Sequence, residues 1–150
     1  MVDDKGLVDT AAFLVAKLGG RVEARFAEAL GPLGLRPRHC GLLSLLASDP
    51  APQMDLARRL GVTPSVVVDM VDELEKLMAV RRVRDATDRR RQVVELTARG
   101  KRLLTKSVAV ARALDAELLA LVPVDEHPVL LAGLRRLGDA YRIPGQPTPG

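Results

Sequence analysis

The stretch Leu56–Leu74, LARRLGVTPSVVVDMVDEL, decides the fold of this 150-residue chain. Its apolar residues recur at spacings of three and four on both sides of a short turn, which is the pattern of two amphipathic helices. Gly61 suits the turn, and Ala57 is small enough to let the two helices approach each other. Thr63 and Pro64 are favoured residues at the N-cap and the first turn of the second helix. The stretch therefore predicts a helix-turn-helix.

The second of these helices is predicted to run from Thr63 to about Leu77, with an apolar inner face and a mixed outer face. The inner face is expected to hold Val67, Met70, Val71, Leu74 and Leu77, and the outer face Ser65, Val66, Val68, Asp69, Asp72, Glu73 and Lys76. Two valines on the outer face are unusual for a surface that meets only water.

The segment that follows, Arg84–Thr97 (RDATDRRRQVVELT), concentrates charge at one tip and then alternates between polar and apolar residues. Val80 and Val83 alternate with arginines before the tip, and Gln92–Leu96 alternates after it, as strands do. Two short strands joined by a turn-rich tip form a β-hairpin. A hairpin appended to a helix-turn-helix is a wing. A solvated charged loop is the alternative interpretation of the same cluster.

Helices are also predicted on both sides of this lobe. The first runs from Val8 to Leu30, and Gly19 and Gly20 in its middle are expected to weaken or bend it. The other helices are predicted at 37–47, 53–60, 98–122 and 125–141, and a disordered tail at 144–150. Hydrophobic residues make up 47% of the chain and aromatic residues only 2%, which favours a single helical domain with a core of Leu, Val and Ala.

Several classes of protein are excluded. The single cysteine, Cys40, excludes an internal disulfide and a multi-cysteine zinc site. His39 and His127 lack the spacing of metal ligands, and no nucleophile–base pair or phosphate-binding glycine loop can be assembled. We therefore expect no metal, no cofactor and no enzymatic activity. Because there is no signal-peptide pattern and no run near the ~18 apolar residues of a membrane span, we expect a cytoplasmic protein without membrane contact.

The positive charge is unevenly distributed. The net charge of the chain is +4, but the segment 79–106 alone carries ten lysines and arginines against three acidic residues, so the rest of the chain is net negative. A basic focus on a mildly acidic body is typical of a protein that binds nucleic acid.

Three motifs carry a resemblance to a known family: LARRLGVTPS at 56–65, VDELEKL at 71–77 and, above all, DATDRRRQVVELTARG at 85–100. Together they resemble the multiple-antibiotic-resistance-type (MarR-type) transcriptional regulators, which are homodimeric winged-helix DNA-binding proteins. The resemblance implies a mostly α fold with a small β wing. It divides the chain into a winged helix-turn-helix lobe at 35–99 and dimerisation helices at 1–34 and 100–143.

The resemblance also implies a function and its residues. The chain would be a sequence-specific transcriptional regulator, a repressor of a pseudo-palindromic double-stranded operator, relieved by a small anionic or phenolic ligand. The reading helix would meet the major groove through Thr63, Pro64, Ser65, Val66, Val68 and Asp69. The wing would contact DNA through Arg82, Arg84, Asp88, Arg89, Arg90 and Arg91. Arg90 would enter the minor groove, and Asp88 would orient the arginine side chains at the tip.

The chain departs from the family pattern at several positions. Val66 and Val68 stand where hydroxyl residues are usual, and Asp69 stands where a basic residue is common. A valine there suits contact with a thymine methyl group. Met78 replaces the usual glycine after the reading helix, where a positive φ is favoured. Arg36 stands where Thr or Ser would cap the helix that precedes the helix-turn-helix.

The acidic residues of the reading helix leave an alternative function open. Asp69, Asp72 and Glu73 would repel phosphates. They favour a helical, dimeric ligand-binding or interaction protein that does not bind DNA.

A second alternative is a thiol-sensing regulator that uses Cys40. Arg38 and His39 precede it and would lower the pKa of its thiol, although a cysteine in a leucine-rich helix is more often a small buried apolar residue. Relatives that sense peroxide carry their reactive cysteine in the first helix, where this chain has none. A contact of His39 and Cys40 with a ligand is a further hypothesis, and a surface or interface position for His39 competes with it.

Overall fold

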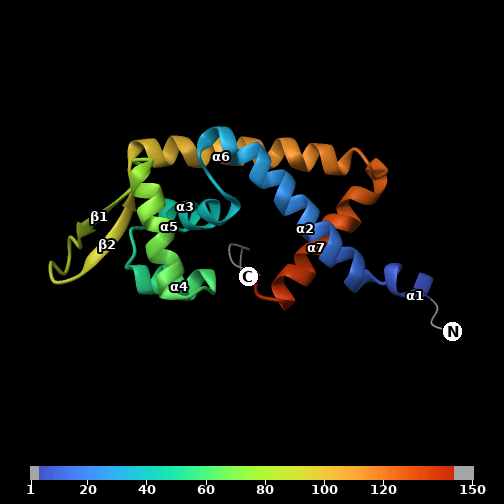
Figure 1. Cartoon of the computed structure of the whole chain (residues 1–150), viewed down its shortest axis with the longest axis horizontal. Helices are drawn as coiled ribbons and strands as arrows, with labels where there is room; N and C mark the ends of the chain where they lie inside the picture. The colour runs from blue at the N-terminus through green and yellow to red at the C-terminus, as the bar shows by residue number, and fades with distance from the viewer. Residues whose placement is uncertain (1–3, 144–150) are drawn as a thin grey trace.

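The computed structural model describes residues 4–143, and the predicted tail at 144–150 lies outside the described residues. The elements follow one another as α1 (Asp4–Val8), α2 (Ala11–Leu30), a short 3-10 helix η1 (Gly31–Leu33), α3 (Pro37–Ser48), α4 (Gln53–Leu60), α5 (Pro64–Lys76), β1 (Val80–Arg84), β2 (Gln92–Leu96), α6 (Ala98–Leu119), η2 (Val124–Glu126) and α7 (His127–Ala140). The long helix α6 joins two regions: α3, α4, α5 and the hairpin lie at one end, and α2 and α7 extend towards the other (Figure 1).

The helix-turn-helix of α4 and α5 is confirmed with the predicted boundaries of α4. Gly61 ends α4 in the left-handed conformation, at φ 66°, which glycine adopts without a steric penalty. The N–H of Val62 donates to the carbonyl of Ala57 and closes the turn. Leu56 and Ala57 are buried against the following helix, as the spacing predicts.

The core lies under α5 and draws on every element of the lobe. Its fully or nearly buried members are Leu42, Leu43 and Leu46 of α3, Leu56 and Ala57 of α4, Val67, Met70, Val71 and Leu74 of α5, Val80 and Val94 of the hairpin, and Leu103 of α6. Burial of a side chain of this size stabilises the fold by roughly 1.5–3 kcal/mol. The inner face of α5 is therefore held against α3, α4 and β1.

The hairpin has the predicted strands, paired antiparallel from Val80–Leu96 to Arg84–Gln92. A third segment joins it, which the sequence pattern did not indicate. Ala51 forms an antiparallel bridge with Val94, with N–H to carbonyl hydrogen bonds of 3.1 and 2.9 Å. Pro52 follows Ala51 and favours an extended conformation there. The wing is thereby bonded to the α3–α4 connection as well as to its own strands.

The LTARG segment joins the wing to α6 by a close backbone contact. The hydroxyl of Thr97 accepts a hydrogen bond from the N–H of Gly100 and donates one to the carbonyl of Met78, at 3.0 and 2.6 Å. A Cβ added at Gly100 would lie 1.9 Å from the carbonyl oxygen of Ala79. Gly100 is therefore required for this close approach.

Met78 follows α5 with φ at 55°, in the left-handed region expected for the glycine that it replaces. A side chain in this conformation costs roughly 1–2 kcal/mol. The N–H groups of Met78 and Ala79 donate to carbonyls of Glu75 and Leu74, which closes the end of the helix. The wing begins immediately afterwards, so this strained residue sets the direction of β1.

The first helix is not interrupted at Gly19 and Gly20, because α2 continues through both of them. The break lies instead before Ala11, where the Thr10 hydroxyl accepts from the N–H of Phe13 at 3.3 Å and caps α2. A glycine in a helix costs about 1 kcal/mol relative to alanine, and the long run of backbone hydrogen bonds on either side offsets that cost. At the other end, α7 begins at His127, two residues later than predicted and after η2.

The α2, α6 and α7 helices carry large apolar side chains that the single chain leaves exposed. They are Leu14, Val15, Leu18, Val108, Leu118, Leu130, Leu134 and Leu137, together with Leu121 just after α6 and Tyr141 just after α7. The apolar side chains of α6 are therefore only partly buried within the chain, and the buried positions of that helix are Gly100, Leu103, Ser107 and Leu114. An apolar groove lined by residues of α2 and α7 lies in the same region.

The contact at Gly100 yields a stability prediction. Gly100→Ala forces the added methyl group into the Ala79 carbonyl, so we expect a loss of at least about 2 kcal/mol in the free energy of unfolding. Gly20→Ala is the matched control, because nothing lies within 4 Å of its added Cβ. Urea unfolding of both variants at one protein concentration measures the difference, and equal stabilities would contradict the close contact.

Candidate nucleic-acid interface

Helix α5 presents one solvent-facing stripe. Its inner residues Val67, Met70, Val71 and Leu74 are buried, as predicted. Ser65, Val68 and Asp69 are exposed on the opposite side near its N-terminal end. Val66 was expected on the outer face, but it is half-buried and packs against the core. Of the two unusual valines, Val68 is the one that faces solvent.

Thr63 occupies the N-cap position of α5, but the prediction that its side chain caps the helix is wrong. The hydroxyl makes no capping hydrogen bond. It lies 3.1 Å from the hydroxyl of Ser65 instead. Pro64 follows and has no N–H to satisfy at that position. Thr63 and Ser65 therefore form a pair of hydroxyls at the exposed start of the helix.

The acidic residues in the second half of α5 are bound by basic residues of other elements. Asp72 pairs with Arg82, with a nitrogen–oxygen distance of 2.7 Å, and Glu75 pairs with the same guanidinium. Glu73 pairs with Arg38 at 2.6 Å. Of the acidic residues on this helix, only Asp69 has no ion pair within the described residues. The negative charge that favoured a protein without DNA binding is largely paired inside the lobe.

Arg82 joins three elements. From β1, its guanidinium donates to Asp72 and Glu75 of α5 and to the side-chain oxygen of Gln53 of α4, the last at 2.7 Å. Its backbone N–H also donates to Glu75 at 3.1 Å. The side chain is 21% exposed. These contacts hold the wing against the helix-turn-helix, and a DNA contact by Arg82 remains a prediction that this geometry does not favour.

The wing tip is shaped by its two aspartates. Asp85 accepts hydrogen bonds from the N–H and the hydroxyl of Thr87, both at 3.0 Å. Asp88 accepts from the backbone N–H of Arg90 at 3.0 Å. Asp88 therefore orders the backbone of the tip, and the expectation that it orients arginine side chains is wrong. The hydrogen bonds from Thr87 also lower the pKa of Asp85.

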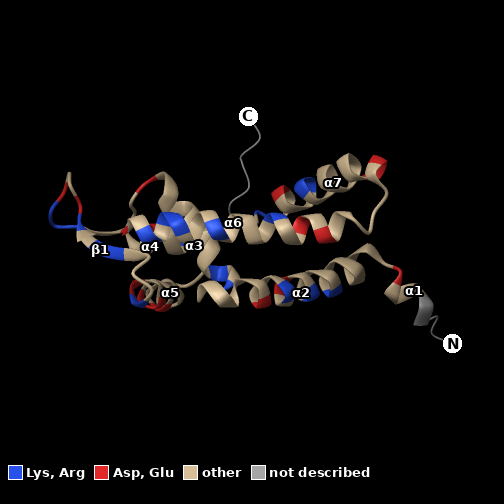
Figure 2. Ribbon diagram, turned by 90° about the horizontal axis from the view of Figure 1, so that it is seen from above, with Lys and Arg blue, Asp and Glu red and all other residues tan. Residues whose placement is uncertain are grey.

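The arginines of the tip are exposed and free of carboxylates. Arg84, Arg89, Arg90 and Arg91 are all exposed, and within the described part of the chain none of them forms a salt bridge. Figure 2 shows the basic residues gathered at the end of the hairpin beside the two aspartates of the tip. The tip is solvated, but the local Asp–Arg pairs of the alternative interpretation are not found among the described residues. Such a cluster on a rigid tip fits contact with a phosphate backbone or a narrow minor groove.

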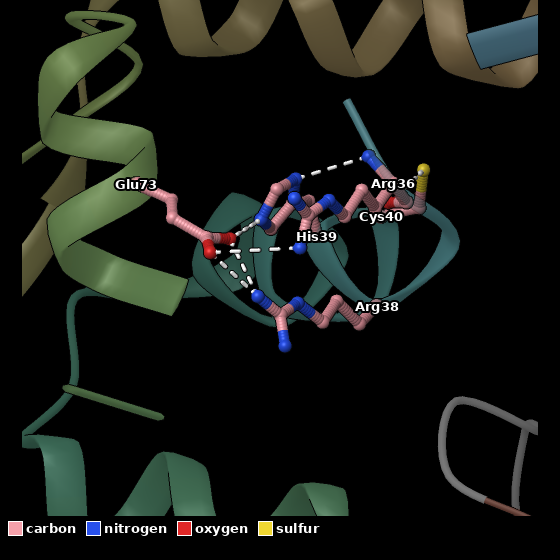
Figure 3. A network of polar contacts seen from close by, with 5 residues as sticks. All are labelled: Arg36, Arg38, His39, Cys40 and Glu73. Carbon is pink, nitrogen blue, oxygen red and sulfur yellow. Dashed lines mark hydrogen bonds and ion pairs between the residues drawn. The ribbon is translucent and has the colours of Figure 1, made fainter. Parts of the chain in front are cut away.

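His39 and Cys40 lie at the N-terminal end of α3. His39 is only 2% exposed, so the expectation of a surface or interface position is wrong. Its Nδ1 accepts from the backbone N–H of Arg36 at 3.0 Å, and its Nε2 lies 2.6 Å from Glu73 (Figure 3). Both ring nitrogens are thus used within the chain and none is left for a ligand in this conformation. This cap also explains how α3 begins without a Thr or Ser at Arg36.

Cys40 is half-buried, and its Sγ lies 3.9 Å from the carbonyl of Arg36. Burial raises the pKa of its thiol, which is opposite to the predicted lowering by Arg38 and His39. A protonated thiol is a poor nucleophile. The environment of Cys40 therefore does not support the thiol-sensing alternative.

Gln53 and Glu75 support the interface, and the sequence analysis did not single them out. Their partner Arg82 is 29 and 7 residues away in the chain. No local pattern links Gln53 to Arg82, because only the packing of α4 beside the wing brings them together. In the described residues, no group of three or more His, Cys, Asp or Glu side chains is arranged to hold a metal ion. None of the described helices is long and apolar enough to cross a membrane.

A reading helix in a helix-turn-helix, followed by a basic hairpin, defines a winged-helix DNA-binding fold. Comparison with known proteins agrees. The family model described as MarR family matches residues 33–91. The HTH-type transcriptional repressor Rv2887 of Mycobacterium tuberculosis is 32% identical over 136 residues, which are 89% of this chain and 98% of that protein.

Two solved structures of CouR share the fold. The crystal structure of CouR from Rhodococcus jostii RHA1 bound to p-coumaroyl-CoA is 31% identical, with 87% of this chain and 93% of that chain covered and a TM-score of 0.72. The repressor CouR bound to a 23-mer DNA duplex is 26% identical, with 92% and 99% covered and a TM-score of 0.78. The chain belongs to the MarR family of transcriptional regulators. The family and the fold class predicted from the sequence are confirmed.

The ion pairs of Glu73 yield a pH prediction. Hydrogen bonds from Arg38 first, and from His39 second, lower the pKa of Glu73 from its ordinary 4.5 to about 2. A lowered carboxyl pKa in the folded state stabilises the fold above pH 4.5, and that contribution is lost as the pH falls from 4.5 towards 2. We expect wild-type stability to fall more steeply across this window than that of Glu73→Gln.

Urea unfolding at several pH values and one protein concentration measures both slopes. Glu23→Gln, on the exposed side of α2, is the matched control and should keep the wild-type slope. Identical slopes for the wild type and Glu73→Gln would show that the ion pairs do not contribute to stability.

Proposed function

We propose that this protein is a homodimeric repressor that binds a pseudo-palindromic operator and releases it when a small anionic or phenolic ligand binds. We further propose that it acts in the cytoplasm, the compartment of DNA in the bacteria of its relatives, and that it catalyses no reaction. The observation that carries the proposal is the set of unpaired, exposed arginines on the wing beside the exposed stripe of α5.

The arginines and the stripe have different roles in the proposed complex. Arg84, Arg89 and Arg91 neutralise phosphates, and the counterions released from DNA contribute much of the affinity. Arg90, at the turn ordered by Asp88, enters the minor groove, where the negative potential is focused. Thr63 and Pro64 approach the backbone, and the sequence is read in the major groove from the exposed stripe of α5.

Val68 and Asp69 suggest which base edges are read. The exposed valine suits a thymine methyl group, and an aspartate accepts a hydrogen bond from the amino group of cytosine. Val66 is half-buried against the core and contributes to DNA contact less directly. The operator of this protein is therefore expected to place T and C opposite the middle of α5.

Dimerisation is supported by the exposed apolar side chains of α2, α6 and α7. A contiguous apolar surface of this kind is rare on a monomer and typical of an obligate interface. Joining two chains there would give the assembly two α5 helices, one from each chain. Winged-helix dimers of this kind read half-sites about 34 Å apart, which is one turn of DNA.

Ligand control is supported by the relative CouR, whose structure with p-coumaroyl-CoA shares the fold. A ligand that binds more tightly to a dimer whose two lobes are not spaced for the operator shifts the population away from the DNA-binding state. The alternative, a dimer without DNA binding, rested on three acidic residues of α5, and two of these, Asp72 and Glu73, are paired with arginines. Asp69 remains as its only support.

Arg90→Ala tests the wing. We expect about a tenfold loss of affinity for the DNA upstream of the protein's own gene, and a salt slope reduced by about one, because one phosphate-region contact is lost. Binding measured across a salt series gives both quantities. Arg135→Ala on α7 removes the same charge from an exposed position away from the wing and is the matched control. An unchanged affinity and salt slope in Arg90→Ala would disprove the wing contact.

Leu134→Glu tests the dimer. Leu134 is 50% exposed in the single chain and lines the groove of α2 and α7. Burying a carboxylate in an apolar interface without a partner is unfavourable, so we expect dissociation to monomers together with loss of operator binding. Sedimentation velocity measures the mass. A Leu134→Glu protein that stays dimeric would place the interface elsewhere.

A further inference from the structure

The strongest polar link between α3 and the reading helix is formed at Glu73. Its carboxylate lies 2.6 Å from His39 Nε2 and accepts hydrogen bonds of 2.6 and 2.8 Å from Arg38 (Figure 3). Arg36 adds a longer ion pair at 3.7 Å. Every one of these partners belongs to the first turn of α3 or to the residue before it. One side chain of α5 thus binds the whole N-terminal end of α3.

The hydrogen bonds determine the protonation of His39. Because the N–H of Arg36 donates to Nδ1, that nitrogen carries no proton. Nε2 must then carry the proton and donate it to Glu73. The imidazole is neutral, and each ring nitrogen has one partner, one within α3 and one on α5. A single buried side chain caps one helix and anchors the other.

His39 differs from the arginines that share its carboxylate. The side chains of Arg36 and Arg38 are 65% and 40% exposed, so water competes for their contacts, whereas that of His39 is 2% exposed. The hydrogen bond is shielded from water on the His39 side, the Glu73 side chain is 32% exposed, and a hydrogen bond to a charged group is strong and restrictive in geometry. His39 is therefore the rigid member of the cluster.

The Glu73 anchor and the Arg82 network hold α5 from different sides. Asp72 and Glu73 are adjacent in sequence, so they point about 100° apart around the helix. Asp72 is bound from the wing and Glu73 from α3. Two anchors on different sides limit the rotation of α5 about its own axis. Burial of an apolar face alone would allow this rotation more easily.

We propose that His39 is a positioning residue for DNA recognition, whose two hydrogen bonds fix the rotation of α5 and so the presentation of Ser65, Val68 and Asp69. The inference deepens the proposed function and rests on it, because it assumes that α5 reads an operator. His39 does not touch DNA. It acts through Glu73.

Protonation of His39 breaks the arrangement. A proton on Nδ1 would face the N–H of Arg36, so two donors would meet. The charged groups around the ring are Glu73 from α5 and Arg36 and Arg38 from its own end of α3, and burial is the main reason that the pKa of His39 lies below 6.5. Glu73 stays ionised across this range, since its pKa is about 2. Operator affinity should therefore fall as His39 becomes protonated, and this happens only below the ordinary 6.5, because burial lowers the pKa of His39.

Two variants separate positioning from simple packing. His39→Leu fills the space without hydrogen bonds, and we expect operator affinity at about pH 7.5 to fall roughly tenfold. His39→Gln restores one acceptor for the Arg36 N–H and one donor for Glu73, as Gln does at this position of a capping box. It should recover wild-type affinity and, unlike the wild type, show no loss attributable to this site when the pH is lowered stepwise below 6.5. Ser44→Ala, exposed on the same helix, is the matched control.

Amide hydrogen exchange of the DNA-free protein provides a second readout. We expect the amides of α5 to exchange faster in His39→Leu than in the wild type, and His39→Gln to restore protection. Equal α5 protection and equal affinity in His39→Leu would overturn the inference. So would a His39→Gln variant that keeps the wild-type loss in acid or fails to recover affinity while folded. If the wild type binds no upstream DNA, the proposed function fails, and hydrogen exchange alone then decides whether His39 holds α5.

Discussion

The orientation of the reading helix α5 depends on how its carboxylates are bound. Burial of Val67, Met70, Val71 and Leu74 holds the helix on the core, but apolar contacts are not directional. The orientation of α5 is fixed by ion pairs instead. Arg82 of the wing binds Asp72 and Glu75, and the N-terminal end of α3 binds Glu73. The wing, the helix-turn-helix and α3 are joined through this one helix.

This pairing also determines which charged side chains of the lobe are bound within the protein and which are free. Asp72, Glu73 and Glu75 are turned towards arginines and a histidine inside the protein, and within the described residues the arginines of the wing tip form no ion pair. The two aspartates of the tip bind backbone N–H groups, so they order the hairpin without neutralising its side chains. An excess of free positive charge on a rigid tip is what binding to a polyanion needs.

Local rules in the sequence predicted most of the fold. The boundaries of α4, the left-handed Gly61 and the two strands follow from short-range spacing and backbone sterics, whereas the positive φ at Met78 was expected from the resemblance. The errors have a common cause. The start of the first helix at Val8 and the cap by Thr63 are local preferences that the cap at Thr10 and the neighbouring Ser65 hydroxyl overrode. The resemblance supplied the expected site residues, and the geometry changed the interpretation of Arg82, Asp88 and His39.

By itself, the sequence determined the order of the elements, the charge of the wing and the family, because these depend on residues near one another in the chain. Only the tertiary structure decided which charges are free. Gln53 and Arg82, or His39 and Glu73, are about 30 residues apart, and no pattern of short period joins them. Whether an arginine binds a phosphate or a carboxylate of its own protein depends on what folding brings within hydrogen-bond distance. The distance between an arginine and a carboxylate far away in the chain is set by how the helices pack.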